Sequence, residues 1–213
     1  MARENAKHVF RGPDGVARCW WCQSAPEFLP YHDNEWGYPV ADDIRLFEKM
    51  SLESFQSGLS WRTILNKRES FRDAFTGFDF HRVAEFGSKD VERLLGNAGI
   101  VRHRGKIEAT INNARVTQEI VARYGSLAAY VWKFEPDPSE RPPRMTWKEL
   151  SKLSKTRASI ALSKDLKTHG WKFFGPTTAY AFMQAMGLVN DHQDVCDCRA
   201  KAEDARALFV RPG

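Results

Sequence analysis

Histidine and cysteine residues gather near the two ends of this chain, and such residues are the usual ligands of zinc. They are Cys19, Cys22, His32, His192, Cys196 and Cys198. His192 and Cys196 are four residues apart, so one helical turn would place both side chains on the same face. A pair from each end would form a closed site of two nitrogens and two sulfurs, which is structural because no position remains for substrate water. Four unrelated thiols are the alternative, and spacing alone does not choose between neighbouring cysteines at either end.

A second group of residues has the form of a clamp for a nucleic-acid backbone. The segment LLGNAGIVRHRGKIEATI, residues 94–111, predicts a helix that ends at Gly99, a short turn and a basic second helix. The exposed amides at such a helix start accept phosphate oxygens, and Arg102, Arg104 and Lys106 add positive charge without reading base sequence. An ordinary turn between two helices, with a solvated basic face, is the alternative.

A third group combines one carboxylate with several aromatic rings. Glu53 lies in the apolar helical stretch MSLESFQSGLSW, where a carboxylate pairs, shifts its pKa or meets a ligand. A solvent-facing glutamate on an amphipathic helix is the alternative. Trp21, Tyr31, Trp36 and Trp61 would all serve as core residues, but aromatic rings near turns are also what gripping an unstacked base requires.

The elements that must position these groups are predicted to be helical nearly throughout. Apolar residues recur every three or four positions, and we expect helices over residues 42–60, 61–75, 88–99, 104–125, 158–170 and 175–187. Asp42 and Ser60 are expected N-caps, and Gly125, Gly170 and Gly187 are expected helix ends. The proline-rich segment 135–145 predicts a surface loop or a seam between two helical lobes. The predicted fold class is all-α.

Composition limits the class of protein further. The 213 residues suit one domain or two tightly joined lobes, and the formal net charge of +5 mildly favours a polyanionic partner. No apolar run reaches 18 residues and the N-terminus has no secretory signal, so we expect a cytoplasmic protein, with reduced cysteines and no membrane contact. We expect a monomer with a flexible lead-in over residues 1–17, one domain over 18–200 and a C-terminal extension over 201–213.

Several collinear segments resemble the DNA-3-methyladenine glycosylase I family. They are RCWW, YHDNEWG, the LE..Q.GLSW pattern of residues 52–61, GIVRHRGKI, KFFGPTTAYAFMQA.GLVNDH and the C-terminal H...C. They extend from about residue 18 to residue 198. The resemblance implies the fold of the helix-hairpin-helix glycosylase superfamily, with two helical lobes and a lesion pocket between them.

The resemblance also implies one structural Zn²⁺ and chooses its ligands. The family's motifs fall on Cys19, His32, His192 and Cys196, which leaves Cys22 and Cys198 as additional cysteines. Asp33 and Asp191 adjoin the two histidines, and we expect them to orient the imidazole rings.

The family's base pocket falls on Glu53 as the catalytic residue and on Trp21, Tyr31 and Trp61 as base-binding residues. Phe28 stands in the same pocket position where family members often have a second tyrosine. Phe55 follows Ser54 where a Gly-Gln pair is frequent, and Trp36 is expected to pack in the core.

The implied activity is hydrolysis of the N-glycosidic bond of 3-methyladenine in double-stranded alkylated DNA, after base flipping, without cleavage of the strand. The product is an abasic site. One alternative is a catalytically weakened helix-hairpin-helix DNA-binding protein that keeps its zinc. A second alternative is a hydrolase with an open zinc held by His32 and His192.

Overall fold

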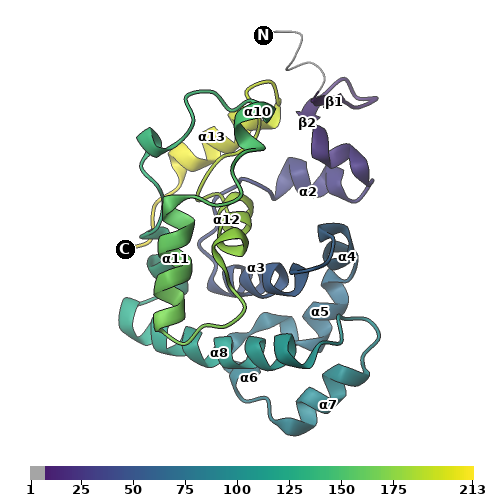
Figure 1. Cartoon of the computed structure of the whole chain (residues 1–213), viewed down its shortest axis with the longest axis vertical. Helices are drawn as coiled ribbons and strands as arrows, with labels where there is room; N and C mark the ends of the chain where they lie inside the picture. The colour runs from purple at the N-terminus through teal and green to yellow at the C-terminus, as the bar shows by residue number, and fades with distance from the viewer. Residues whose placement is uncertain (1–7) are drawn as a thin grey trace.

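Helices dominate the computed structural model, which describes residues 8–213 (Figure 1). The chain begins with β1 (Val9–Arg11), β2 (Ala17–Cys19) and the 3-10 turn η1 (Trp20–Ser24). The next elements are α2 (Phe28–Asn34), α3 (Asp43–Gln56), α4 (Trp61–Asn66), α5 (Arg68–Ala74), η2 (Thr76–Phe78), α6 (Phe80–Ala84), α7 (Ser88–Gly96) and α8 (Arg104–Tyr124). The last are α9 (Leu127–Trp132), η3 (Pro138–Glu140), α10 (Trp147–Leu150), α11 (Arg157–Thr168), α12 (Pro176–Ala185) and α13 (Cys198–Leu208). The predicted all-α class is confirmed, and the β1–β2 hairpin, which pairs Val9 with Cys19, is a small addition.

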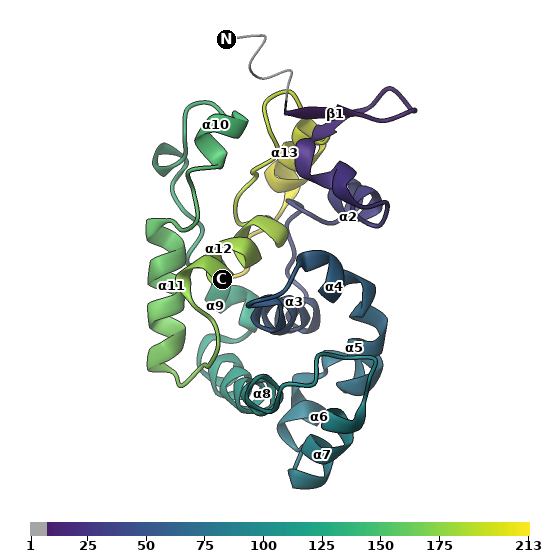
Figure 2. The same ribbon diagram turned by 45° about the vertical axis from the view of Figure 1, so that its right-hand side comes forward.

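Helix α3 lies in the middle of the molecule, in contact with α4, α8, α9 and α12 (Figures 1 and 2). The predicted cap is present, since the Asp42 carboxylate accepts a hydrogen bond from the Arg45 amide. The fully buried Phe47 and Phe55 of α3 belong to one core with large side chains from other elements, among them Phe71, Phe75, Phe78, Tyr130 and Phe182. A helix held on so many sides gives its side chains fixed positions.

The helix ends agree with the sequence where local chemistry decides them. Gly125, Gly170 and Gly187 follow α8, α11 and α12 at φ values of 87°, 87° and 72°, a left-handed conformation that favours glycine. Ser60 caps α4 as predicted by accepting from the Thr63 amide.

Three predicted helices differ from the structure. The helix expected over 42–60 ends at Gln56, because the chain leaves the helical conformation at Ser57 (φ −49°, ψ 114°). The helix expected over 61–75 is divided into α4 and α5, because the chain turns at Lys67 (φ −100°, ψ 2°). The helix expected to end at Gly99 ends at Gly96 instead, since Asn97 is already extended and the Gly99 amide donates to the Asn97 side chain. Gly99 is therefore a residue of the hairpin turn and not a left-handed helix end.

The two ends of the described chain are joined. The Ala17 amide donates to the Asp197 carboxylate at 2.7 Å, and the Asp197 amide donates to the Ala17 carbonyl at 2.8 Å. Residues 8–17 of the predicted lead-in thus belong to the fold, whereas residues 1–7 lie outside the described part of the chain. The boundary expected at residue 200 falls inside α13, and Arg206 and Arg211 beyond it both pair with Glu135.

The proline-rich segment 135–145 is anchored to the C-terminal part of the chain. Arg141 forms a buried ion pair with Asp191, and the Asp194 amide donates to the Met145 carbonyl at 3.0 Å. Within residues 8–213, no helix has the length and apolar character needed to cross a lipid bilayer.

Candidate active site and metal centre

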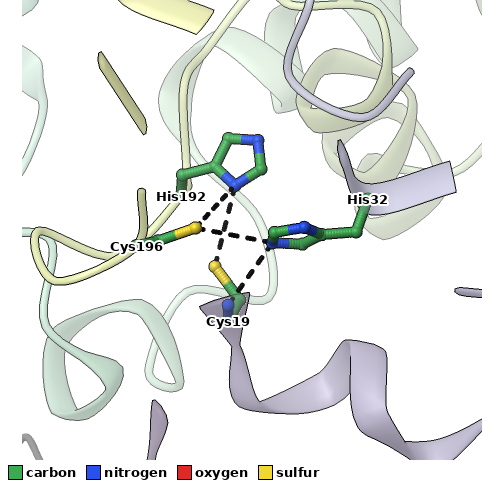
Figure 3. Close-up of side chains that lie close together, drawn as sticks. All are labelled: Cys19, His32, His192 and Cys196. Atoms are coloured by element: carbon green, nitrogen blue, oxygen red, sulfur yellow. Dashed lines mark hydrogen bonds between the residues drawn. The ribbon is translucent and has the colours of Figure 1, made fainter. Parts of the chain in front are cut away.

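Cys19, His32, His192 and Cys196 converge in the interior, all of them at most 4% exposed (Figure 3). Their ligand atoms lie within 4.8 Å of one another. The His192 Nδ1 atom is 3.8 Å from Cys19 Sγ and 3.5 Å from Cys196 Sγ, which is in turn 3.6 Å from His32 Nε2. In a tetrahedral zinc site the sulfur and nitrogen ligands are about 3.6 Å apart, given the usual metal–ligand lengths. The predicted four-residue cluster is thus assembled with the spacing that a tetrahedral metal ion requires.

Hydrogen bonds set the orientation of both imidazole rings. His32 Nδ1 lies 2.8 Å from the Asp33 carboxylate, which is itself held by the Arg18 guanidinium, so His32 Nε2 faces the cluster. His192 Nε2 donates to the Trp36 carbonyl at 2.9 Å, which leaves His192 Nδ1 as the ligand atom. The prediction for Asp33 agrees with this geometry.

The prediction for Asp191 is wrong, because its carboxylate points away from the His192 ring. It accepts hydrogen bonds from Arg141, Tyr180 and Gln184. The main-chain carbonyl of Trp36 takes the orienting position instead. Sequence reasoning missed this contact because a carbonyl leaves no signature in the residue type.

Burial and charge act differently on the two histidines. Burial lowers the pKa of His192 to about 3, so its ring is neutral at pH 7, as a metal ligand must be. Burial also opposes protonation of His32, but the neighbouring Cys196 and Cys198 and the Asp33 carboxylate outweigh it and raise the pKa of His32 to about 9.

A cavity of about 350 Å³ lies next to this cluster. Its walls come from η1, α2, α3, α4, α10 and α12 and from the segment that follows α12. All of Trp21, Tyr31, Glu53 and Trp61 line it, with Trp20, Trp36, Gln56, Trp147, Gln184 and Gln193 among their neighbours. The structure therefore brings the predicted catalytic residue and three of the predicted base-binding residues to one concave surface, as a site for a flat aromatic ligand requires.

Glu53 is positioned by the last turns of α3, where it is 6% exposed. Trp61 is the first residue of α4, placed there by the left-handed turn at Gly58 (φ 83°) and the Ser60 cap. Its indole N–H has no acceptor among the described residues, although it is buried. A carboxylate and an unused N–H in a wall that also carries several aromatic rings provide one acceptor and one donor for a bound ring.

Two aromatic residues that depart from the family's pattern lie away from the cavity. Phe28 was expected to contact the base, but it does not line the cavity; it is 9% exposed and packs edge-on against Trp21, at 5.8 Å between ring centres. Phe55 is fully buried and packs against Phe71 at 4.7 Å and Phe75 at 5.9 Å. Neither ring replaces a polar group in the cavity wall, so these departures do not favour the catalytically weakened alternative.

The hairpin between α7 and α8 differs from its prediction at two of the four residues expected to contact the DNA backbone, Gly99, Arg102, Arg104 and Lys106. Arg102 and Arg104 are exposed, and Arg104 pairs with Glu92 at 2.7 Å on the protein surface. Lys106 was expected to face DNA, but it is 7% exposed and its ammonium donates to the carbonyls of Phe55 and Ser57. Lys106 therefore joins the hairpin to the end of α3 and is not available to a phosphate. The Gly99 amide, already bonded to Asn97, is also occupied.

The fold and the site together define a class: an all-helical protein with a helix-hairpin-helix element and an acidic, tryptophan-lined cavity, of the kind that receives an everted base. A family model described as methyladenine glycosylase matches residues 21–200. The chain belongs to this methyladenine glycosylase family.

The chain matches individual relatives over nearly the whole of their length. The chain is 47% identical to DNA-3-methyladenine glycosylase 1 of Escherichia coli (strain K12) over 183 residues, 86% of this chain and 97% of that protein. It superposes on a crystal structure of 3-methyladenine DNA glycosylase I with a TM-score of 0.76 and 48% identity, covering 85% and 98% of the two chains. It also superposes on a structure of 3-methyladenine DNA glycosylase I from Staphylococcus aureus, described as the structural basis of 3-methyladenine recognition. The TM-score is 0.75 and the sequence identity 37%, over 82% of this chain and 92% of that chain.

Proposed function

We propose that this chain is a DNA repair glycosylase that removes 3-methyladenine from double-stranded alkylated DNA and leaves an abasic site. The observation that carries the proposal is the buried Glu53 carboxylate in the wall of a tryptophan-lined cavity, in a chain whose relatives are DNA-3-methyladenine glycosylases. The target nucleotide would rotate out of the duplex into this cavity, because the glycosidic bond is out of reach inside the stack.

Each cavity residue has a role in this proposal. The rings of Trp21, Tyr31 and Trp61 would enclose the methylated purine, whose positive charge is attracted to aromatic faces. The Glu53 carboxylate would accept a hydrogen bond from the exocyclic amino group. These contacts favour a cationic alkylated base over neutral adenine.

The chemistry needs little further help from side chains. Alkylation at N3 gives the base a positive charge, so it leaves readily when the bond between C1′ and N9 breaks and the electron pair moves to the base. Water then forms a bond to C1′ and gives up a proton, which yields the abasic sugar and neutral 3-methyladenine. Recognition by the cavity, and not acid–base catalysis, would then account for selectivity.

The exposed Arg102 and Arg104, together with the first amides of α8, are our proposed contact with the DNA backbone. The ion pair of Arg104 with Glu92 lies at the surface, where such pairs contribute little stability and exchange readily for a phosphate. We leave Lys106 and Gly99 out of this contact because their donors are used within the protein.

We also propose that the cluster of Cys19, His32, His192 and Cys196 holds one structural Zn²⁺. Two thiolates and two imidazoles suit zinc, and four protein ligands leave no place for a reacting water. This donor set argues against the hydrolase alternative.

Release of free base from alkylated DNA tests the proposed function directly. Wild-type protein should release 3-methyladenine from a methylated duplex faster than spontaneous depurination does, as measured by chromatography of the soluble products. A protein that binds the duplex but releases base only at the spontaneous rate would instead be the DNA-binding alternative.

A further inference from the structure

A lysine that the proposed mechanism does not use lies behind the base cavity. Lys49 is one helical turn before Glu53 on α3 and is only 5% exposed. Its ammonium is 2.8 Å from the Glu53 carboxylate and donates to the Tyr31 hydroxyl at 2.8 Å. It also lies 3.4 Å from the centre of the Trp61 ring. One cation thus contacts three of the residues that we assign to the base.

The donors of Lys49 account for all three contacts. An ammonium has three N–H groups; one meets the carboxylate, one meets the hydroxyl, and the charge lies over an indole face. Lys49 does not line the cavity, although Tyr31, Glu53 and Trp61 do. A base in the cavity would meet these three side chains while Lys49 holds them from behind.

The other carboxylates around Lys49 have partners of their own. Glu35 pairs with Arg68 at 2.6 Å, and Glu48 pairs with Arg72 at 2.8 Å. Arg45 also lines the space beside Lys49, and on the cavity side the Asp191 carboxylate is paired with Arg141. Within the described residues, Lys49 is therefore the cation assigned to Glu53, and Glu53 without it would be a buried carboxylate with no counter-charge.

We infer that Lys49 is a positioning residue for base release: it keeps Glu53 ionised and aimed into the cavity, and it fixes the Tyr31 hydroxyl and the Trp61 ring. The inference rests on the proposed function, because it acts through the residues assigned to the base. Burial lowers the pKa of Lys49 against the pull of Glu53. An unpaired buried carboxylate takes up a proton at higher pH than a paired one, so removal of the Lys49 charge should favour the neutral form of the side chain that it contacts.

The test is the pH dependence of kcat/KM for 3-methyladenine release, which reports ionisations of the free enzyme. Lys49→Met should move the acid limb to higher pH by about one unit or more, so that activity on that limb falls about tenfold or more for the same pH. Lys49→Arg, which keeps the charge, should keep the wild-type limb. If Lys49→Met does not fold, Lys49→Gln carries the same comparison, because it removes the charge and keeps a donor for Tyr31.

Two controls separate positioning from a general effect on α3. Glu48→Gln breaks a buried ion pair on the same helix without touching Glu53, and its limb should match the wild type. In the Glu53→Gln background, adding Lys49→Met should leave the acid limb of the kcat/KM profile unchanged, because the carboxyl group proposed to titrate is already absent. A Lys49→Met profile that superimposes on the wild type, or a shift that persists in the Glu53→Gln background, would overturn the inference.

Binding of free 3-methyladenine can be measured by the quenching of tryptophan fluorescence. Its pH dependence allows the same comparison of Lys49→Met with the wild type without hydrolysis. It keeps the inference testable if the wild type binds the base but does not release it from DNA, which would refute the proposed function alone. A borohydride-trapped adduct of abasic DNA that depends on Lys49 would also contradict the inference, because the amine would then be a nucleophile that reaches the sugar.

Discussion

Glu53 is the residue on which recognition of the base depends most. It is buried near the end of a helix that is itself surrounded, and its carboxylate lies in the wall of a cavity lined by five tryptophans and Tyr31. A hydrogen bond that involves a charged group contributes about 1.5–3 kcal/mol. The neighbouring Trp61 N–H adds a donor, and both groups are fixed before any ligand arrives.

Glu53→Gln should therefore reduce the rate of 3-methyladenine release by about 10- to 100-fold, the rate equivalent of that hydrogen bond. The amide keeps the shape of the side chain but loses the charge. Affinity for undamaged duplex, measured by fluorescence anisotropy, should stay as in the wild type because Glu53 faces the base cavity and is not part of the proposed backbone contact. An excision rate equal to that of the wild type would show that Glu53 does not read the base.

At the scale of elements, the hairpin between α7 and α8 presents its two arginines at the surface while Lys106 fastens it to α3. This arrangement links the proposed DNA contact to the helix that carries Glu53. A phosphate held by the hairpin would thus have a fixed relation to the cavity.

Replacing both Arg102 and Arg104 by alanine should weaken DNA binding at every sequence alike. The slope of log affinity against log salt concentration should fall by about 2, since each phosphate contact contributes about 0.9. Arg123→Ala is the matched control, because it removes an exposed arginine from the same helix roughly 28 Å away at 1.5 Å per residue. If the wild type, the double alanine variant and Arg123→Ala all show the same salt dependence of DNA affinity, the hairpin is not the backbone contact.

The metal cluster joins β2 and α2 to the segment before α13, so its loss acts on whole elements. Cys196→Ser, or removal of the ion with a strong chelator, should lower the melting temperature by several degrees, because ligands that are far apart in sequence would be released from one another. Hydrogen exchange in the β1–β2 hairpin should rise at the same time. Cys22→Ser is the control, since Cys22 is buried outside the cluster. A metal-free protein with an unchanged melting curve would remove the structural role of zinc.

At the scale of the whole molecule, the chain closes on itself. The β1–β2 hairpin contacts Asp197, and the cluster takes two ligands from each end. This closure places η1 and its tryptophans against the segment that follows α12, which completes the cavity around α3. The cavity therefore depends on contacts between residues more than 150 positions apart.

The sequence predicts best those helix starts and ends that depend on residues close together in the chain. The caps at Asp42 and Ser60 and the glycine ends of α8, α11 and α12 follow from local hydrogen bonds and backbone conformation. The division at Lys67 and the early end of α7 were missed, since the spacing of apolar residues does not show where Lys67 turns the backbone or where the Asn97 side chain accepts from the Gly99 amide.

Within the site, the residue types alone predict a metal cluster and an aromatic group. The family resemblance then indicates which cysteines bind the metal and which aromatic rings contact the base. Lys49 was missed although it stands four residues before Glu53, a spacing that places both on one helix face. The inward direction of Lys106 and the outward packing of Phe28 depend on neighbouring elements, which no local pattern describes.

The most direct test of the account is chromatography of the bases released from alkylated double-stranded DNA by the wild type and by Glu53→Gln. We predict that the wild type releases free 3-methyladenine well above the spontaneous background, and that Glu53→Gln does so about 10- to 100-fold more slowly. Wild-type protein that binds this DNA and yields no free base above background would contradict the account.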